Sequence, residues 1–194
     1  MKLLHVDTGI TGEGSVSRQL SSAIVETLVR DNPGLEVVRR DLDADPIPHL
    51  DSGNLGKDAG ATILREFQEA DVVVVGAPMY NLGIPSQLKA WFDRVVVAGQ
   101  TFRYTPEGAQ GLAGGKTVIV ASARGGFYAP GTVQAESDFH EPYLRALFRF
   151  IGIDDVSIVR AEGVAVSPEH RKAALETAFA AATKLAGQIP ALAA

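Results

Sequence analysis

Residues 8–17 combine glycines and serines in a pattern that suits the binding of a phosphate group. Three glycines fall between residues 8 and 14, and Ser15, Val16 and Ser17 follow them. Backbone N–H groups at the start of a helix hold anions together with the helix dipole, and serine hydroxyls add donors. The spacing is neither Gly-x-x-x-x-Gly-Lys-Ser/Thr nor Gly-x-Gly-x-x-Gly, and the first cation is Arg18. A plain turn with a serine cap is the alternative, and Glu13 counts slightly in its favour.

Two further segments have compositions that suit a flat aromatic ligand. Residues 78–83, with the sequence Pro-Met-Tyr-Asn-Leu-Gly, are apolar enough to line a heteroaromatic ring, although a hydrophobic turn against the next helix is the alternative. Residues 122–128 contain Gly125 and Gly126, where the backbone is able to approach a ligand closely. Arg124 would either stabilise charge on a ring or form a surface salt bridge.

Alternating apolar runs and helical periods predict the elements that position these segments. Apolar residues recur every four positions from Val16 to Leu28, which predicts a helix that Asn32-Pro33-Gly34 ends. Four consecutive valines at 72–75 predict a strand that is buried on both faces. The predicted strands are residues 2–7, 35–42, 71–78, 116–121 and 156–161.

Five strands that alternate with helices predict an α/β fold with an open, mostly parallel, doubly wound sheet. We expect a single domain over residues 1–194, with one irregular insertion at 99–115 that lies where it could cover a site. In such sheets ligands bind beyond the carboxyl ends of the strands. The three candidate segments all follow strands, so we expect them to converge there.

Composition excludes several classes of function. The chain of 194 residues is 46% hydrophobic with a net charge of −5, which is typical of a globular domain and argues against nucleic acid as a partner. It has no cysteine, which removes disulfides and thiolate chemistry and fits a reducing compartment. No apolar stretch approaches the roughly 18 residues that span a bilayer. We therefore expect a cytoplasmic protein with no membrane partner.

No residues are spaced as a metal site. The four histidines are His5, in a predicted strand, and His49, His140 and His170. We expect solvated or capping roles for all four, and no metal ligand or general acid among them.

Several motifs in combination resemble one family. Ala77-Pro78-Met79-Tyr80-Asn81, followed by Ser86-Gln87-Leu88-Lys89 and Phe92-Asp93, resembles FMN-dependent NADH-azoreductases, which are also described as NADH:quinone oxidoreductases. Residues 101–105, 124–126, 150–153 and 161–163 resemble the same family, so the likeness covers essentially the whole chain. It implies a flavodoxin-like three-layer α/β/α fold whose five-stranded parallel sheet has the order 2-1-3-4-5. It also implies a homodimer with one FMN per subunit and sites at the subunit interface.

The resemblance further implies an enzyme that uses NADH to reduce quinones, by two electrons, and aromatic azo compounds in a ping-pong cycle. The chemistry would belong to FMN, with no catalytic side chain, and backbone donors of residues 80–83 and 124–126 would stabilise negative charge on the ring. The expected FMN-binding residues are Gly9, Ser15, Val16 and Ser17 at the phosphate end, and Pro78, Met79, Tyr80, Asn81, Leu82, Ala123, Arg124, Gly125 and Gly126 around the ring. The expected substrate-pocket residues are Tyr104, Phe127, Tyr128 and Phe150.

The chain departs from the family pattern at three places. Gly9 and Ala123 stand where serine is frequent, and Phe127-Tyr128 stands where some members carry a histidine. The last departure changes the polarity over the ring and puts the substrate preference in doubt. No basic cluster marks a 2′-phosphate pocket, which favours NADH over NADPH.

Two other functions are compatible with this kind of sheet. A flavodoxin-type electron carrier would need an exposed flavin edge and a strongly acidic docking face, which the moderate charge disfavours. A signalling module with Asp7 as phosphoacceptor would need an acidic cluster and a lysine after the fifth strand, and the sequence has neither.

Overall fold

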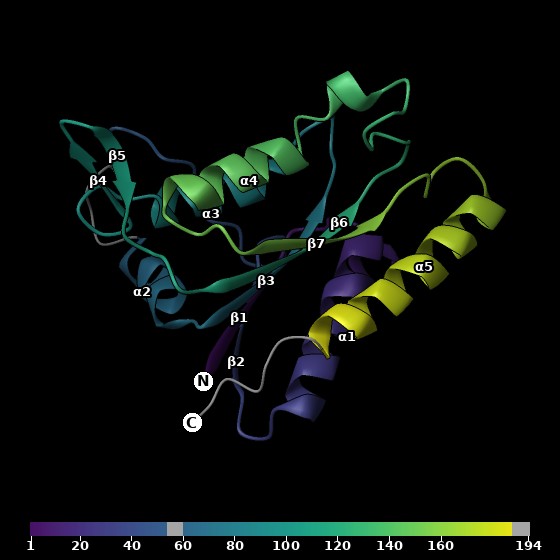
Figure 1. The fold of residues 1–194 in the computed structure, drawn as a ribbon, viewed down its shortest axis with the longest axis horizontal. Coiled ribbons are helices and arrows are strands. Elements are labelled where there is room, and N and C mark those ends of the chain that lie inside the picture. The colour runs from purple at the N-terminus through teal and green to yellow at the C-terminus, as the bar shows by residue number, and fades with distance from the viewer. Residues whose placement is uncertain (54–59, 188–194) are drawn as a thin grey trace.

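The computed structural model describes residues 1–53 and 60–187, and Figure 1 shows a twisted sheet between two layers of helices. The strands are β1 (Lys2–Asp7), β2 (Glu36–Asp41), β3 (Val72–Pro78), β6 (Thr117–Ala123) and β7 (Val156–Ala161). All neighbouring pairs are parallel, in the order β2-β1-β3-β6-β7. The predicted fold class and strand order are therefore confirmed.

The central strand β3 is the hydrophobic centre of the molecule. Every residue from Val72 to Pro78 is buried, as the unbroken valine run predicts for a strand with helices on both faces. The edge strand β2 has no fully buried residue, in agreement with its more polar sequence.

The helices are α1 (Val16–Asp31), α2 (Ala61–Glu69), α3 (Ser86–Val95), α4 (Glu141–Phe150) and α5 (Pro168–Ala186). On one face of the sheet, α1 packs beside α5, with Leu20 and Ile24 in the same apolar cluster as Ala178. On the other face, α2, α3 and α4 enclose a second cluster that contains Phe67, Trp91, Phe92, Leu144 and Phe148. No helix in the described ranges has the length and apolar character to span a membrane.

The insertion at 99–115 is an ordered hairpin, contrary to the expectation of irregular structure. Strands β4 (Phe102–Thr105) and β5 (Gly108–Gly111) pair in antiparallel fashion. Figure 1 shows the hairpin at the left end of the molecule, away from the start of α1 and the segment after β6. Within one chain, the hairpin therefore lies at the opposite end of the molecule from these segments.

The position of the hairpin follows from the topology. A helix that connects two parallel strands returns the chain to their amino ends, so residues between α3 and β6 emerge at that edge. In agreement, Lys116 Nζ donates to the carbonyl of Ala70, just before β3. The Ala113 N–H donates to the carbonyl of Ile151, a few residues before β7.

Candidate active site

The loop between β1 and α1 is anchored on β3 and ends in unused backbone donors. Thr8 donates twice to the carbonyl of Gly76, from its N–H at 3.2 Å and from its hydroxyl at 2.7 Å. After a single 3₁₀ turn, η1 (Gly12–Gly14), Ser15 caps α1 and its Oγ accepts from the N–H of Arg18. Within the described residues, the N–H groups of Val16 and Ser17 have no acceptor. Two donors at the positive end of a 16-residue helix form a place for an anion.

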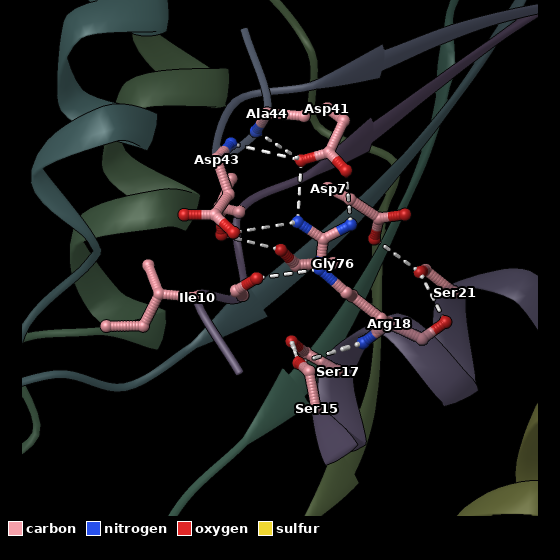
Figure 2. Close-up of polar contacts among 12 residues, drawn as sticks. Asp7, Ile10, Ser15, Ser17, Arg18, Ser21, Asp41, Asp43, Ala44 and Gly76 are labelled. Atoms are coloured by element: carbon pink, nitrogen blue, oxygen red, sulfur yellow. Dashed lines mark hydrogen bonds and ion pairs between the residues drawn. The ribbon is translucent and has the colours of Figure 1, made fainter. Parts of the chain in front are cut away.

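Arg18 holds the loop but does not present its charge to it. Its guanidinium donates to both carboxylate oxygens of Asp41 at 2.6 Å, and its Nε donates to the carbonyl of Gly9 at 2.7 Å (Figure 2). The hydrogen bonds from Arg18 lower the pKa of the Asp41 carboxyl to about 2. The pair is therefore ionised at neutral pH, and Asp41 neutralises the only cation that the sequence places near the loop.

The fold adds a second cation that is remote in the sequence. Arg171, in the first turns of α5, donates from Nη2 to the carbonyl of Gly14 at 3.0 Å. Because α1 and α5 pack side by side, the Arg171 guanidinium reaches the residue that precedes the capping Ser15. Sequence reasoning missed it, since nothing local relates residue 171 to residue 14.

Gly9 is required by the position of the Ser15 hydroxyl. A Cβ at residue 9 would lie 2.1 Å from Ser15 Oγ, which is 3.1 Å from Ser17 Oγ (Figure 2). The space where a serine at residue 9 would begin is therefore filled by Ser15. In this chain, the Ser15 hydroxyl therefore takes the place that a serine side chain at residue 9 would otherwise need.

A Gly9→Ala substitution should therefore turn the Ser15 hydroxyl away from the start of α1. We expect the free energy of unfolding to fall by about 1 kcal/mol, because the N-cap is lost, and FMN affinity to fall several-fold. Flavin fluorescence titration and urea unfolding measure the two effects. In a Ser15→Gly background, where the hydroxyl is already absent, Gly9→Ala should cause little further loss of affinity; a second several-fold loss there would mean that the clash with Ser15 is not the cause.

Hydrogen bonds join all three loops at the carboxyl edge of the sheet. The N–H of Ile10 in the first loop donates to the phenol oxygen of Tyr80 in the second at 3.1 Å. The N–H of Met79 in the second loop donates to the carbonyl of Ala123, where the third loop begins, at 2.8 Å. The expected convergence of the three segments is therefore present.

The second loop is a tight turn in a left-handed conformation. Tyr80 and Gly83 each donate to the other's carbonyl, and Asn81 and Leu82 between them have φ values of 49° and 72°. Non-glycine residues adopt such values rarely, and they do so most often at functional sites. The N–H groups of Tyr80 and Gly83 are thus already used, which narrows the expected donors at 80–83 to Asn81 and Leu82.

The third loop is held so that its amide N–H groups face one way. The carbonyls of Arg124, Gly125 and Gly126 accept from the N–H groups of residues 164, 165 and 163 respectively, at 3.0–3.2 Å. In a trans peptide the N–H points opposite to the carbonyl of the same unit, so the N–H groups of Gly125 and Gly126 point away from residues 163–165. Neither has an acceptor among the described residues. The segment 163–165 that sets this orientation was not recognised from the sequence.

Arg124 is buried among carboxylates and does not form the surface salt bridge that the sequence offered as one alternative. Its side chain has no exposed surface, and its guanidinium contacts Asp138 at 2.9 Å, Glu141 at 2.5 Å and Glu162 at 3.0 Å. Glu141 also pairs with Arg160. The backbone N–H of Arg124 donates to Ala161. The surface salt bridge is therefore wrong, because the side chain is buried and a buried charge needs several carboxylate partners. Since the N–H of Arg124 is already used, the expected donors of the third loop narrow to Gly125 and Gly126.

The four aromatic residues expected at the substrate pocket fall into two groups. Phe127 packs on Gly163 and lies edge-on to His170, with ring centroids 6.1 Å apart, whereas Tyr128 folds back to Gly126. Tyr104 and Phe150 both contact Phe102 at the hairpin. The Tyr104 side chain is exposed over 76% of its surface, at the other end of the chain from the three loops. One chain therefore does not bring the two groups together.

His140, at the start of α4, is buried. It has no exposed surface, so the expected solvated role is wrong, and although His140 occupies the N-cap position of α4, its side chain makes no capping hydrogen bond. His5, between Arg39 and Asp7, is buried as well. Burial, reinforced by the positive charge of Arg124, lowers the pKa of His140 from 6.5 to about 4, although Glu141 and Asp138 oppose this. Within the described residues, no group of histidines and carboxylates is arranged as a metal site.

The low pKa of His140 predicts that stability falls with acidification. Between pH 6.5 and 4 the unfolded chain binds a proton that the folded chain does not, so the free energy of unfolding should drop by about 3 kcal/mol as the pH falls through this window. Urea unfolding at pH 7, 5.5 and 4 measures the drop. A His140→Gln variant should lose this part of the pH dependence; an unchanged slope would contradict the assignment.

The parallel order β2-β1-β3-β6-β7, with the loops after β1, β3 and β6 joined at one edge, defines a flavodoxin-like protein. The chain belongs to the family described as having the flavodoxin-like fold, whose model matches residues 1–186.

Individual relatives agree with this membership. The FMN-dependent NADH:quinone oxidoreductase 1 of Xanthomonas axonopodis pv. citri (strain 306) is 55% identical over 186 residues, which cover 93% of this chain and 94% of that protein. The crystal structure of azoreductase from Bacillus anthracis str. Sterne superposes with a TM-score of 0.88 at 31% identity, covering 97% of this chain and 100% of that one. An FMN-dependent NADH-azoreductase from Bacillus anthracis str. Ames Ancestor, in complex with FMN, has a TM-score of 0.88 at 27% identity, with coverages of 97% and 98%.

Proposed function

We infer that this chain is an FMN-dependent oxidoreductase that takes hydride from NADH and reduces quinones and aromatic azo compounds. The observation that carries the inference is a set of backbone N–H groups at the carboxyl edge of the sheet, from residues 16, 17, 81, 82, 125 and 126, that have no acceptor within residues 1–53 and 60–187. The relatives named above, an FMN-dependent NADH:quinone oxidoreductase and FMN-dependent azoreductases, support the same activity.

These donors fit FMN in both charge and shape. The N–H groups of Val16 and Ser17, with the hydroxyls of Ser15 and Ser17, would hold the phosphate. The N–H groups of Asn81, Leu82, Gly125 and Gly126 would reach ring atoms, while Pro78, Met79, Tyr80 and Ala123 would line the ring. Bound FMN supplies the chemistry, since it accepts hydride and passes two electrons to the acceptor.

The chain itself contributes position and electrostatics. Backbone N–H groups that are fixed before the reaction stabilise negative charge on the ring without reorganisation. No side chain need act as an acid, because quinone oxygens and azo nitrogens can take protons from water. One open face would serve NADH and the acceptor in turn, which is a ping-pong cycle.

The separation of the two aromatic groups supports a homodimer. Within one subunit, Tyr104 and Phe150 lie at the hairpin, far from the three loops. They would therefore reach a flavin only in a second subunit. We therefore propose that the hairpin of one subunit covers the site of its partner, where Phe127 and Tyr128 complete the pocket. The lack of cysteine fits a cytoplasmic location.

Arg171 should make flavin binding depend on the phosphate. The Arg171 guanidinium contacts the carbonyl of Gly14, and Gly14 is about two residues, or under 8 Å of chain, from the N–H of Val16. Its positive charge therefore lies within a Debye length of the proposed phosphate site. In Arg171→Gln we expect FMN affinity to fall about fivefold at low salt, with riboflavin affinity unchanged. Fluorescence titrations of both flavins measure this, with Lys172→Gln as the control; equal losses for both flavins would contradict the electrostatic role.

The decisive experiment is anaerobic stopped-flow absorbance on the FMN-reconstituted protein. Mixing with NADH should bleach the flavin band rapidly, and subsequent mixing with a benzoquinone should restore it in one two-electron step. A protein that binds FMN but is not bleached by NADH would instead be an electron carrier. If the protein binds no FMN, both the oxidoreductase function and the electron-carrier function are excluded.

A further inference from the structure

The carboxylate of Glu162 joins the two ends of the third loop. Its Oε1 accepts from Arg124 Nη1 at 3.0 Å and from the backbone N–H of Tyr128 at 2.9 Å. Between these contacts lie Gly125 and Gly126, whose N–H groups face the open edge. A single oxygen, on a side chain only 14% exposed, therefore fixes both the beginning and the end of this loop.

The loop between the two contacts is tightly packed. A Cβ at Gly126 would lie 3.3 Å from Tyr128 Cε2 and 3.4 Å from its phenol oxygen. A Cβ at Gly163 would lie 2.5 Å from the Phe127 ring. Each of the two rings thus rests on a glycine, and a small rotation of the backbone at residue 128 would move Tyr128 off Gly126.

We propose that Glu162 is a positioning residue for the reaction, which sets Tyr128 relative to the flavin-facing Gly125 and Gly126. The proposal rests on the proposed function. The carboxylate of Glu162 is occupied by Arg124 and Tyr128, so it acts on the loop through the N–H of Tyr128. Its loss should therefore affect how the acceptor binds more than how fast the bound acceptor reacts.

Removal of Glu162 leaves the buried charges balanced. The network contains the two guanidinium groups of Arg124 and Arg160 and the three carboxylates of Asp138, Glu141 and Glu162. Without Glu162, Arg124 keeps two carboxylate partners, so no buried charge is left alone. A Glu162→Ala variant should therefore fold and bind FMN.

The test compares Glu162→Ala, Glu162→Gln and Glu141→Gln as FMN-reconstituted proteins. In Glu162→Ala we expect a changed visible circular dichroism spectrum of the bound flavin and a roughly tenfold higher KM for benzoquinone, with kcat lowered less than threefold. Glu162→Gln retains an oxygen that accepts both hydrogen bonds, so it should restore most of the KM. Glu141→Gln removes the same charge from the network without contacting Tyr128, and it should leave the KM within twofold.

Two results would overturn the proposal. If Glu162→Ala lowers the melting temperature but keeps the wild-type spectrum and KM, Glu162 only stabilises the fold. If Glu141→Gln raises the KM as much as Glu162→Ala, the network charge and not the contact to Tyr128 is responsible. Failure of the proposed function itself is distinguishable, because the wild-type protein would then bind no FMN or would not be bleached by NADH.

Discussion

An alanine at Gly111 should detach the β4–β5 hairpin from α4 and lower the free energy of unfolding by about 3 kcal/mol, at the upper end for overpacking. The added Cβ would lie 2.1 Å from the backbone nitrogen of Gly152 and 2.3 Å from the carbonyl carbon of Ile151. Backbone atoms are unable to rotate away as a side chain does, so the hairpin itself must move. Urea unfolding of Gly111→Ala measures the loss.

The same substitution should damage the substrate side of the site and spare the cofactor side. The hairpin carries Tyr104 and packs on Phe150 through Phe102, whose ring centroid is 4.6 Å from that of Phe150. We expect the KM for benzoquinone to rise at least tenfold while FMN affinity stays within twofold. Gln110→Ala, an exposed position on the same hairpin, is the control. A stable Gly111→Ala protein with a wild-type KM would show that the hairpin is not part of the pocket.

An alanine at Gly76 should have the opposite effect, with a loss of FMN binding of at least tenfold. Its Cβ would lie 2.3 Å from the Asp7 carboxylate, 3.0 Å from Ser21 Oγ and 3.3 Å from the backbone carbonyl of Ser17. Asp7 accepts a hydrogen bond from Ser21, so neither side chain moves alone (Figure 2). The start of α1 must shift outward, which disrupts the proposed phosphate site at a cost of about 2 kcal/mol in stability.

Fluorescence titration with FMN tests the Gly76→Ala variant, with Gly14→Ala as the control. Gly14 also lies in the first loop, but a Cβ there would meet no atom within 4 Å. The FMN affinity of the Gly14→Ala variant should therefore be unchanged. Wild-type FMN affinity in Gly76→Ala would mean that the close approach of α1 to β3 does not define the site.

Much of the fold was predictable because its signals are local. The valine run at 72–75 lies within the most buried strand, and the four-residue apolar period from Val16 to Leu28 lies within α1. Alternation of strands with helices leaves few topologies open, and the loops after β1, β3 and β6 must then lie at one edge. The family resemblance supplied the strand order and the cofactor.

Most of the corrected expectations depend on contacts between residues that are distant in the sequence. Arg124 reads as a surface cation until residues 138, 141 and 162 bring three carboxylates to it. The hairpin at 102–111 was missed because both of its strands have only four residues, and three of the four residues of β5 are glycine or alanine, which favour strands weakly. The burial of His140 was also missed, because its surroundings include residues as distant in the sequence as Ala77 and Arg124.

By itself, the sequence determined the class of fold, the three loops and the chemistry that they suit, because periodicity, glycines and helix caps act over a few residues. Only the tertiary structure decided which backbone donors remain unused, which charges are neutralised and which residues hold the loops in place. Arg171 at Gly14, Glu162 at Tyr128 and residues 163–165 behind Gly125 and Gly126 illustrate the difference. Burying a polar group without a hydrogen-bond partner costs free energy, so each buried group must be paired. The partner is whichever residue the fold brings close, and its identity cannot be inferred from the neighbouring residues in the chain.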